Sequence, residues 1–113
     1  MHVQLSKSGK KLFFFLKGNY LNISRIIWLE DIVEKLHLKH NVQENEILEI
    51  LANKPKFVLK ESGHKQGEDV YAAFGTTDAG RLLSIFFVYT EDQRAIIVSA
   101  RDMTIKERKK YVR

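Results

Sequence analysis

Cysteine is absent from this sequence of 113 residues, which excludes thiol catalysis, disulfide bridges and zinc sites built from cysteine. Proline occurs once, and no repeat or low-complexity segment divides the chain, so we expect a single domain. No apolar run approaches the roughly 20 residues that a membrane-spanning helix needs. The five apolar residues 12–16 are too few for the core of a signal peptide. We therefore expect a cytoplasmic protein that does not associate with a membrane.

Acidic residues are also missing from one region, the N-terminal quarter of the chain. Residues 1–27 contain five lysines or arginines and no acid, and residues 94–113 contain seven against two acids. The region between them contains seven lysines or arginines against twelve acids, and the net charge is +5. The composition is compatible with an anionic partner, and the fold decides whether the two basic ends form one surface.

The chain divides into a basic extension and a patterned domain. Residues 1–22 alternate poorly, and we expect them to form a short extra strand, to be disordered, or to precede the true start of translation. Residues 23–113 carry the periodic segments and form the predicted domain. Hydrophobic residues make up 44% of the chain, which is enough for one core without disulfide bridges.

Hydrophobic periodicity predicts an α+β domain: a small antiparallel sheet packed with two N-terminal helices and one C-terminal helix. The nearly continuous apolar run at 81–89 predicts the central strand, covered on both faces. Thr104, followed by Glu107 three residues later, is a capping-box pattern and predicts the start of the last helix. The other expected elements are a strand at 23–29, helices at 31–40 and 44–51, and strands at 56–60, 69–75 and 94–100.

The C-terminal end contains the most informative group of side chains. Arg101 stands where the last predicted strand ends. The following helix carries further cations and an aromatic residue: Arg108, Lys109 and Tyr111. A planar guanidinium donates two hydrogen bonds to one phosphate and keeps its charge, which suits a nucleic-acid surface. The alternative is a solvated basic helix in which Arg101 pairs with Asp102 or Glu107.

Other candidate residues occur at the ends of predicted elements: Lys39 and His40 after the first helix, His64 in a turn, and Arg81 at the start of the central strand. A histidine can move protons near neutral pH, and Arg81 can meet Arg101 if their strand ends are neighbours. Each also has a structural explanation, as a cation at a helix end, a solvated turn residue or an exposed strand end. The histidines lack a recognised metal-ligand spacing, so we expect no metal site. Trp28 is predicted as a core residue, with base stacking as the alternative.

Several short motifs follow one another along the chain. They are Trp28, Lys39-His40-x-Val42, Gly80-Arg81-Leu82-Leu83, Phe86-Phe87, and Ile97-x-Ser99-Ala100-Arg101 followed by Glu107-Arg108-x-x-Tyr111. With these motifs, residues 27–111 resemble the BrnT family of toxins, the ribonucleases of type II toxin–antitoxin pairs. The family usually has glycine after its Lys-His pair. Asn41, which also tolerates the left-handed backbone conformation, stands there in this sequence.

The resemblance implies a fold similar to that of the RelE class of toxins. It also implies a metal-independent ribonuclease that arrests translation and needs no cofactor. The implied partner is a BrnA-like antitoxin with a DNA-binding segment, so that operator DNA is contacted only through the antitoxin. The residues implied in RNA binding and cleavage are Lys39, His40, Arg101 and Arg108.

Together these features predict cleavage of single-stranded RNA by attack of its own 2′-hydroxyl on the adjacent phosphate. The reaction needs a base, an acid, and cations that stabilise the charge on phosphorus. We predict Arg101 and Arg81 as the phosphate clamp and His40 or His64 as the proton-transfer group. The predicted RNA-binding residues are Lys39, Arg108, Lys109 and Tyr111. Two alternatives are a non-catalytic module that binds a nucleic acid or an acidic protein, and a decayed toxin that only holds its antitoxin.

Overall fold

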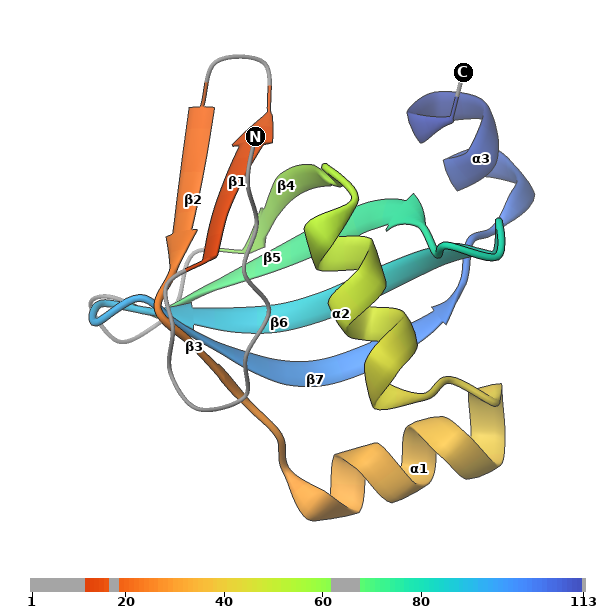
Figure 1. The fold of residues 1–113 in the computed structure, drawn as a ribbon, viewed down its shortest axis with the longest axis horizontal. Helices are drawn as coiled ribbons and strands as arrows, with labels where there is room; N and C mark the ends of the chain where they lie inside the picture. The colour runs from red at the N-terminus through yellow and green to blue at the C-terminus, as the bar shows by residue number, and fades with distance from the viewer. Residues whose placement is uncertain (1–11, 17–18, 62–67, 113) are drawn as a thin grey trace.

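Two β-sheets and three helices make up the computed structural model, which describes residues 12–16, 19–61 and 68–112. Strands β1 and β2 form a two-stranded sheet, and the other five form a mixed sheet in the order β3-β7-β6-β5-β4 (Figure 1). The predicted α+β class is confirmed. The elements are β1 Leu12–Leu16, β2 Asn19–Ile23, β3 Arg25–Ile27, α1 Glu30–His40, α2 Glu44–Ala52, β4 Lys56–Glu61, β5 Glu68–Thr76, β6 Leu82–Thr90, β7 Arg94–Asp102 and α3 Ile105–Tyr111.

The apolar run predicted as the central strand is β6, which lies in the middle of the five-stranded sheet. Leu83, Ile85 and Phe87 are fully buried in the main core. Phe86 points to the opposite face, where it packs in a second, smaller cluster. Strand β6 therefore has covered side chains on both faces, as its sequence predicts.

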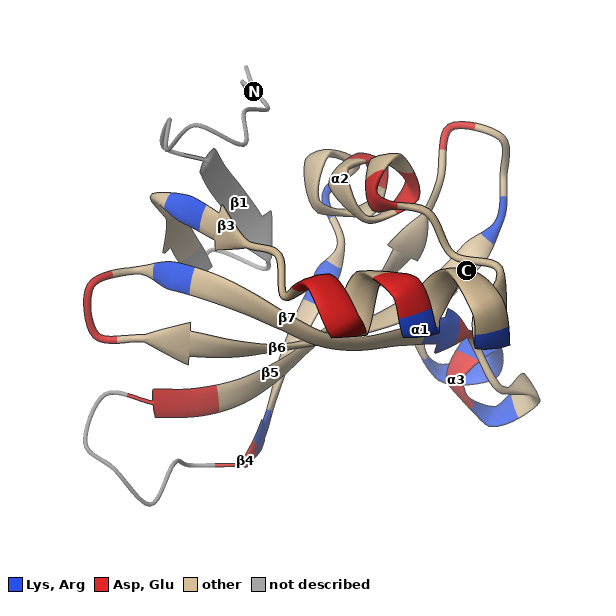
Figure 2. Ribbon diagram, turned by 90° about the horizontal axis from the view of Figure 1, so that it is seen from below, with Lys and Arg blue, Asp and Glu red and all other residues tan. Residues whose placement is uncertain are grey.

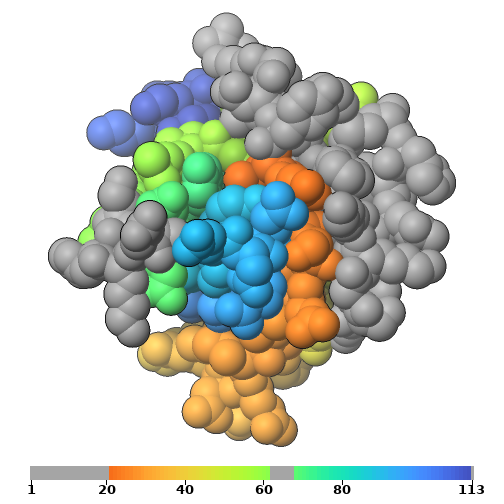
Figure 3. Space-filling model, turned by 90° about the vertical axis from the view of Figure 1, so that its left-hand side faces the viewer, coloured from red at the N-terminus to blue at the C-terminus, as the bar shows by residue number. Residues whose placement is uncertain are grey.

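The predicted strand at 23–29 is interrupted by a bend at Ser24. The main-chain N–H of Ser24 donates to the carbonyl of Gln93 at 2.8 Å, so the bend lies beside the turn between β6 and β7 (Figure 3). After the bend, β3 runs parallel to β7, whereas β4 to β7 are antiparallel to one another as predicted. The sheet is therefore mixed, and the hydrogen bond between Ser24 and Gln93 joins residues that are too far apart in the sequence for a local pattern to predict their contact.

Strands β1 and β2 come largely from the predicted N-terminal extension, and they pair antiparallel. Leu21 and Ile23 of β2 are buried in the main core. The hydroxyl of Tyr89 donates to the carbonyl of Asn22 and fixes the same strand to β6. The end of the predicted extension therefore packs on the domain. Residues 1–11 and 17–18 lie outside the described residues. The domain boundary at residue 22 remains a prediction.

Helices lie on both faces of the five-stranded sheet. Helix α2 crosses one face (Figure 1), where Ile47, Ile50 and Leu51 are buried in the main core. Helix α3 lies on the opposite side of the sheet (Figure 2), and Tyr111 packs there against the cluster around Phe74. The C-terminal helix is therefore separated from α2 by the sheet.

Local signals end α1 and begin α3 as the sequence predicts. Asn41 has the left-handed backbone angles φ 51° and ψ 42° at the C-cap of α1, a conformation that asparagine tolerates. The hydroxyl of Thr104 accepts the N–H of Glu107, and the carboxylate of Glu107 accepts the N–H of Thr104, so the predicted capping box is present. These two caps set the positions of the Lys39–His40 pair and of α3.

Candidate functional site

One end of the sheet collects most of the predicted site residues. The C-terminal end of α1, the turn before β6, the end of β7 and α3 all lie at this end, on the right-hand side of Figure 1. The strand register agrees, because Ser84 near the start of β6 pairs with Arg101 near the end of β7. The residues that these segments carry are Lys39, His40, Arg81, Arg101, Arg108, Lys109 and Tyr111.

His64 is the exception, because it lies outside the described residues. The nearest described residues on either side are Glu61 and Glu68. Glu68 pairs with Thr90 at the end of β6, so these flanking residues lie at the other end of the sheet from Arg81. The role of His64 stays a prediction.

Arg81 is the centre of an ion-pair cluster that joins three elements. Its Nε donates to Asp102 of β7 at 2.9 Å, and its Nη1 donates to Glu46 of α2 at 3.1 Å. Its Nη1 also donates to the carbonyl of Asn41 at 2.7 Å, and its Nη2 to the carbonyl of His40 at 2.9 Å. The hydrogen bond to Asp102, followed by that to Glu46, raises the pKa of Arg81. This side chain therefore ties the end of α1 to α2 and to the end of β7.

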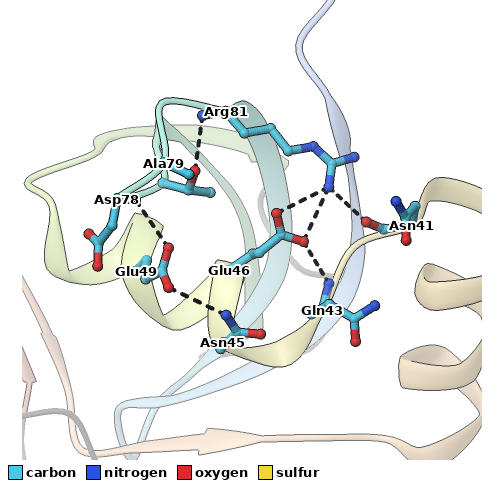
Figure 4. Close-up of a pocket in the computed structure, with 9 residues that line it drawn as sticks. Asn41, Gln43, Asn45, Glu46, Glu49, Asp78, Ala79 and Arg81 are labelled. Carbon is cyan, nitrogen blue, oxygen red and sulfur yellow. Dashed lines mark hydrogen bonds and ion pairs between the residues drawn. The ribbon is translucent and has the colours of Figure 1, made fainter.

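A polar cleft of about 360 Å³ lies beside this cluster (Figure 4). It is lined by the carboxylates of Glu46, Glu49 and Asp78, and by Arg81 as the sole cation among the lining residues. Figure 4 shows the guanidinium directed at Glu46 and Asn41. Because three carboxylates face one cation that is already paired, the cleft does not favour phosphate.

Arg101 forms a corresponding ion pair on the α3 side of the sheet. Its Nη1 and Nη2 donate to the two carboxylate oxygens of Glu107 at 2.7 and 2.9 Å. Its Nη1 also donates to the carbonyl of Asp102 at 3.2 Å. The guanidinium carbon lies 5.1 Å from the centroid of the Phe86 ring, within cation–π range. The predicted structural pairing of Arg101 with Glu107 is therefore present.

The carboxylate of Glu107 is stabilised in its charged form. Hydrogen bonds from Arg101, and then from the Thr104 N–H and the Ser84 hydroxyl, lower its pKa from 4.5 to about 2, although burial acts in the opposite direction. The same pairing raises the pKa of Arg101. Both groups are charged near neutral pH, and the pair is neutral as a unit.

The two arginines differ in the donors that remain available. Among the described residues, Arg101 has no acceptor for its Nε–H or for the second Nη2–H, and these two donors form one edge of the planar group. Its side chain is 33% exposed, so solvent reaches it. Such an edge binds two oxygens of one phosphate. Arg81 keeps a single N–H without an acceptor in the described part of the chain and has no free edge.

Helix α3, which follows Arg101 and the end of β7 in the sequence, carries lysines and arginines along its length (Figure 2). Tyr111 fixes the end of this helix, because its ring stacks on Phe74 with 4.0 Å between centroids and 6° between planes. The apolar side of the helix thus rests on the sheet. Its exposed cations are Lys106, Arg108, Lys109 and Lys110.

Lys39 and His40 are exposed at the C-terminal end of α1. The carbonyl of His40 accepts a hydrogen bond from Arg81, so the main chain is held while the imidazole stays at the surface. An exposed imidazole on a main chain that is held in place can exchange protons with a bound substrate.

The sequence also left some contributors unidentified. Ser84 is fully buried and donates to Glu107 at 2.8 Å, and a serine within an apolar strand is the signal that could have found it. Glu46 gives no such signal, because an acid in the first turn of a helix has a sufficient local explanation. Trp28 is partly buried and packs against the main core from its edge.

The described residues contain no group of three or more His, Asp or Glu side chains that could hold a metal ion. None of the helices within residues 19–61 and 68–112 combines the length and the apolar character needed to cross a membrane.

A comparison with known protein families gives a match that includes most of the segments of the candidate site. A family model described as the ribonuclease toxin BrnT of type II toxin–antitoxin systems matches residues 28–107. The matched region includes the end of α1, Arg81, Arg101 and Glu107, and it ends before the last cations of α3. No curated protein matches the chain.

Proposed function

The chain belongs to the BrnT family of ribonuclease toxins, and we propose that it cleaves single-stranded RNA at the surface around Arg101. The observation that supports Arg101 as the site of cleavage is the free edge of its guanidinium, on a residue that is paired with α3 and its exposed cations. A phosphate at that edge lies on a basic surface, whereas the cleft next to Arg81 is acidic.

The proposed reaction uses the RNA's own 2′-hydroxyl as the nucleophile. Its oxygen forms a bond to the adjacent phosphorus, the bond to the 5′-oxygen breaks, and the products are a 2′,3′-cyclic phosphate and a 5′-hydroxyl. One proton leaves the 2′-oxygen and one reaches the 5′-oxygen, so the reaction balances without a metal ion or cofactor. We assign proton transfer to His40 and stabilisation of the charge on phosphorus to Arg101.

The remaining predicted residues support this reaction. We assign Arg81 to positioning rather than to the phosphate clamp, because all three of its nitrogens have partners and two of the bonds hold the end of α1. Tyr111 holds α3 on the sheet through Phe74. The RNA backbone is bound by exposed cations at both ends of the surface, Lys39, Arg108 and Lys109.

A type II toxin–antitoxin family implies a protein antitoxin and an RNA target. We propose that the antitoxin is BrnA-like, with a DNA-binding segment through which operator DNA is contacted. Cleavage of RNA in the cytoplasm then arrests translation whenever the antitoxin is removed. The fold class is that expected for a RelE-like toxin, a small sheet packed with helices.

The function is tested with the purified protein, free of antitoxin, and a pool of single-stranded RNA in a buffer that contains EDTA. We expect fragments that end in 2′,3′-cyclic phosphates, and no cleavage of RNA whose 2′-hydroxyls are methylated. Fragments with other ends, or activity that requires a divalent metal, would contradict the proposed chemistry.

The placement at Arg101 is tested with the variant Arg101→Ala, and its matched control is Arg94→Ala. Arg94 is a partly exposed arginine of the same strand, paired with Asp92 at 2.9 Å, and it lies at the other end of β7. This variant should cleave RNA like the wild type. If the wild type cleaves no RNA under any of these conditions, the protein is a binding module or a decayed toxin.

A further inference from the structure

Glu107 makes more polar contacts than its capping role requires. The capping box needs the bond from the Thr104 N–H, at 2.9 Å. The same carboxylate also accepts the Ser84 hydroxyl at 2.8 Å and both terminal nitrogens of Arg101. Its side chain is only 17% exposed, although no residue of α3 is fully buried. The carboxylate is therefore directed at the sheet and at Arg101.

These contacts fix the orientation of the Arg101 guanidinium. Glu107 occupies the edge formed by Nη1 and Nη2, and the carbonyl of Asp102 takes the other Nη1 donor. The guanidinium carbon lies over the Phe86 ring, 5.1 Å from its centroid. The edge formed by Nε and Nη2 has no partner among the described residues. Its direction is set by the contacts of Arg101 with residues of β6, β7 and α3. A guanidinium held in this way does not have to reorient when negative charge develops on the phosphate in the transition state.

We infer that Glu107 is a positioning residue for RNA cleavage: it holds Arg101 so that Nε and Nη2 face two non-bridging oxygens of the scissile phosphate. This inference rests on the proposed function. The Arg101–Glu107 pair is neutral as a unit, so long-range attraction of RNA comes from the cations of α3. The contribution of Glu107 is directional and is expected in the turnover rate rather than in the affinity for RNA.

Glu107→Gln separates this role from a structural or an electrostatic one. The variant removes a negative charge next to the RNA and weakens the hold on Arg101. We expect kcat to fall on the order of 10²-fold, as misplacement of a reacting group typically causes. The Kd for 2′-O-methyl RNA, which cannot be cleaved, should be unchanged or lower. The folded fraction under assay conditions is measured by circular dichroism, and kcat is expressed per folded molecule.

The matched control is Asp92→Asn. Asp92 is also a carboxylate paired with an arginine of β7, but it lies at the other end of that strand. Its variant should keep the wild-type kcat. A wild-type kcat per folded molecule for Glu107→Gln would overturn the inference, and so would an equal loss in the two variants.

Chemical rescue of Arg101→Ala gives a second test that leaves Glu107 in place. The truncated side chain leaves a site between the Glu107 carboxylate and the Phe86 ring. Guanidinium chloride at non-denaturing millimolar concentration should restore part of the cleavage rate, and methylammonium chloride should not, because it cannot form two parallel bonds. Equal restoration by the two cations would overturn the edge-on geometry.

Different results would overturn RNA cleavage as the function and the positioning role of Glu107. A wild-type protein that does not cleave RNA overturns the proposed function, and the positioning role falls with it. An active wild type whose Glu107→Gln variant is equally active overturns the positioning role alone.

Discussion

Arg81 and Arg101 lie at the same end of the sheet, and each forms an ion pair with a carboxylate from a helix. Arg81 pairs with Glu46 of α2, and Arg101 pairs with Glu107 of α3. The exposed fractions of the two arginine side chains are similar, 26% and 33%. The difference lies in the other bonds, because Arg81 also reaches Asp102 and two main-chain carbonyls at the end of α1.

The number of occupied donors separates the two arginines better than exposure or charge does. A guanidinium whose nitrogens are all bonded holds protein segments together, and a ligand can reach it only if those bonds break. A guanidinium with one free edge is held firmly and can still bind an anion. On this basis we assign a structural role to the Arg81 cluster and propose the Arg101 cluster as the binding site.

Replacement of Arg101 tests the binding side of the comparison and should have the largest effect. Arg101→Ala should lower the rate of RNA cleavage by about 10²- to 10³-fold, as loss of one preorganised donor to a transition state typically does. Arg101→Lys should recover little of this loss, since an ammonium cannot form two parallel bonds. The assay is cleavage of labelled RNA, with Arg94→Ala as the control. Wild-type activity in Arg101→Ala would place the phosphate clamp elsewhere.

Replacement of Arg81 tests the structural side. Arg81→Ala leaves Glu46, 20% exposed, without its ion-pair partner and leaves two carbonyls without their donor. We expect the free energy of unfolding in urea to fall by about 3 kcal/mol, because a partly buried ion pair and two main-chain hydrogen bonds are lost together. The same measurement on Arg101→Ala should show a smaller loss, about 2 kcal/mol, because Glu107 keeps its hydrogen bonds from Ser84 and Thr104 and only one main-chain carbonyl loses its donor. Equal losses in the two variants would remove the distinction between the clusters.

The sequence predicted those parts of this region that depend on near neighbours. The apolar run at 81–89 predicted the central strand, Thr104 and Glu107 predicted the start of α3, and Asn41 was compatible with the left-handed end of α1. In each case the stabilising contact lies within a few residues or follows from burial alone. The placement of Lys39, His40, Arg81 and Arg101 at one end of the molecule follows from these elements.

The partners of Arg81 could not be predicted, because they are distant in the sequence. Asp102, Glu46 and His40 are separated from it by 21, 35 and 41 residues. The parallel pairing of β3 with β7 is also long-range and depends on the bend at Ser24. The sequence allowed both a phosphate-binding and an ion-paired Arg101, and the structure contains the ion pair and a free edge on the same side chain.

A pH titration sharpens the comparison by removing the charge of Glu107. Its pKa is about 2 in the folded protein and 4.5 ordinarily, so the unfolded chain binds a proton more readily. Its contribution to stability is therefore complete above about pH 4.5 and is lost as the pH falls towards 2. The difference in free energy of unfolding between wild type and Glu107→Gln should be about 2 kcal/mol at pH 6, after allowance for solvent screening. It should shrink through this window, as measured by urea unfolding at several pH values. A difference that stays constant down to pH 2 would contradict the assigned pKa.

The salt dependence of RNA binding should show the smallest effect, and it separates the cations of α3 from the Arg101 edge. Each lysine or arginine that contacts a phosphate of single-stranded RNA displaces counterions, so log K falls with log[salt] by about 0.7 per contact. Arg108 is exposed on α3, so Arg108→Ala should remove about one such contact and flatten the slope by about 0.7. The measurement is the Kd for 2′-O-methyl RNA at several salt concentrations. Arg94→Ala, at the far end of β7, should leave the slope unchanged, because its cation lies away from the proposed surface. An equal change in slope for both variants would mean that RNA responds to the overall charge and that α3 is not the binding surface.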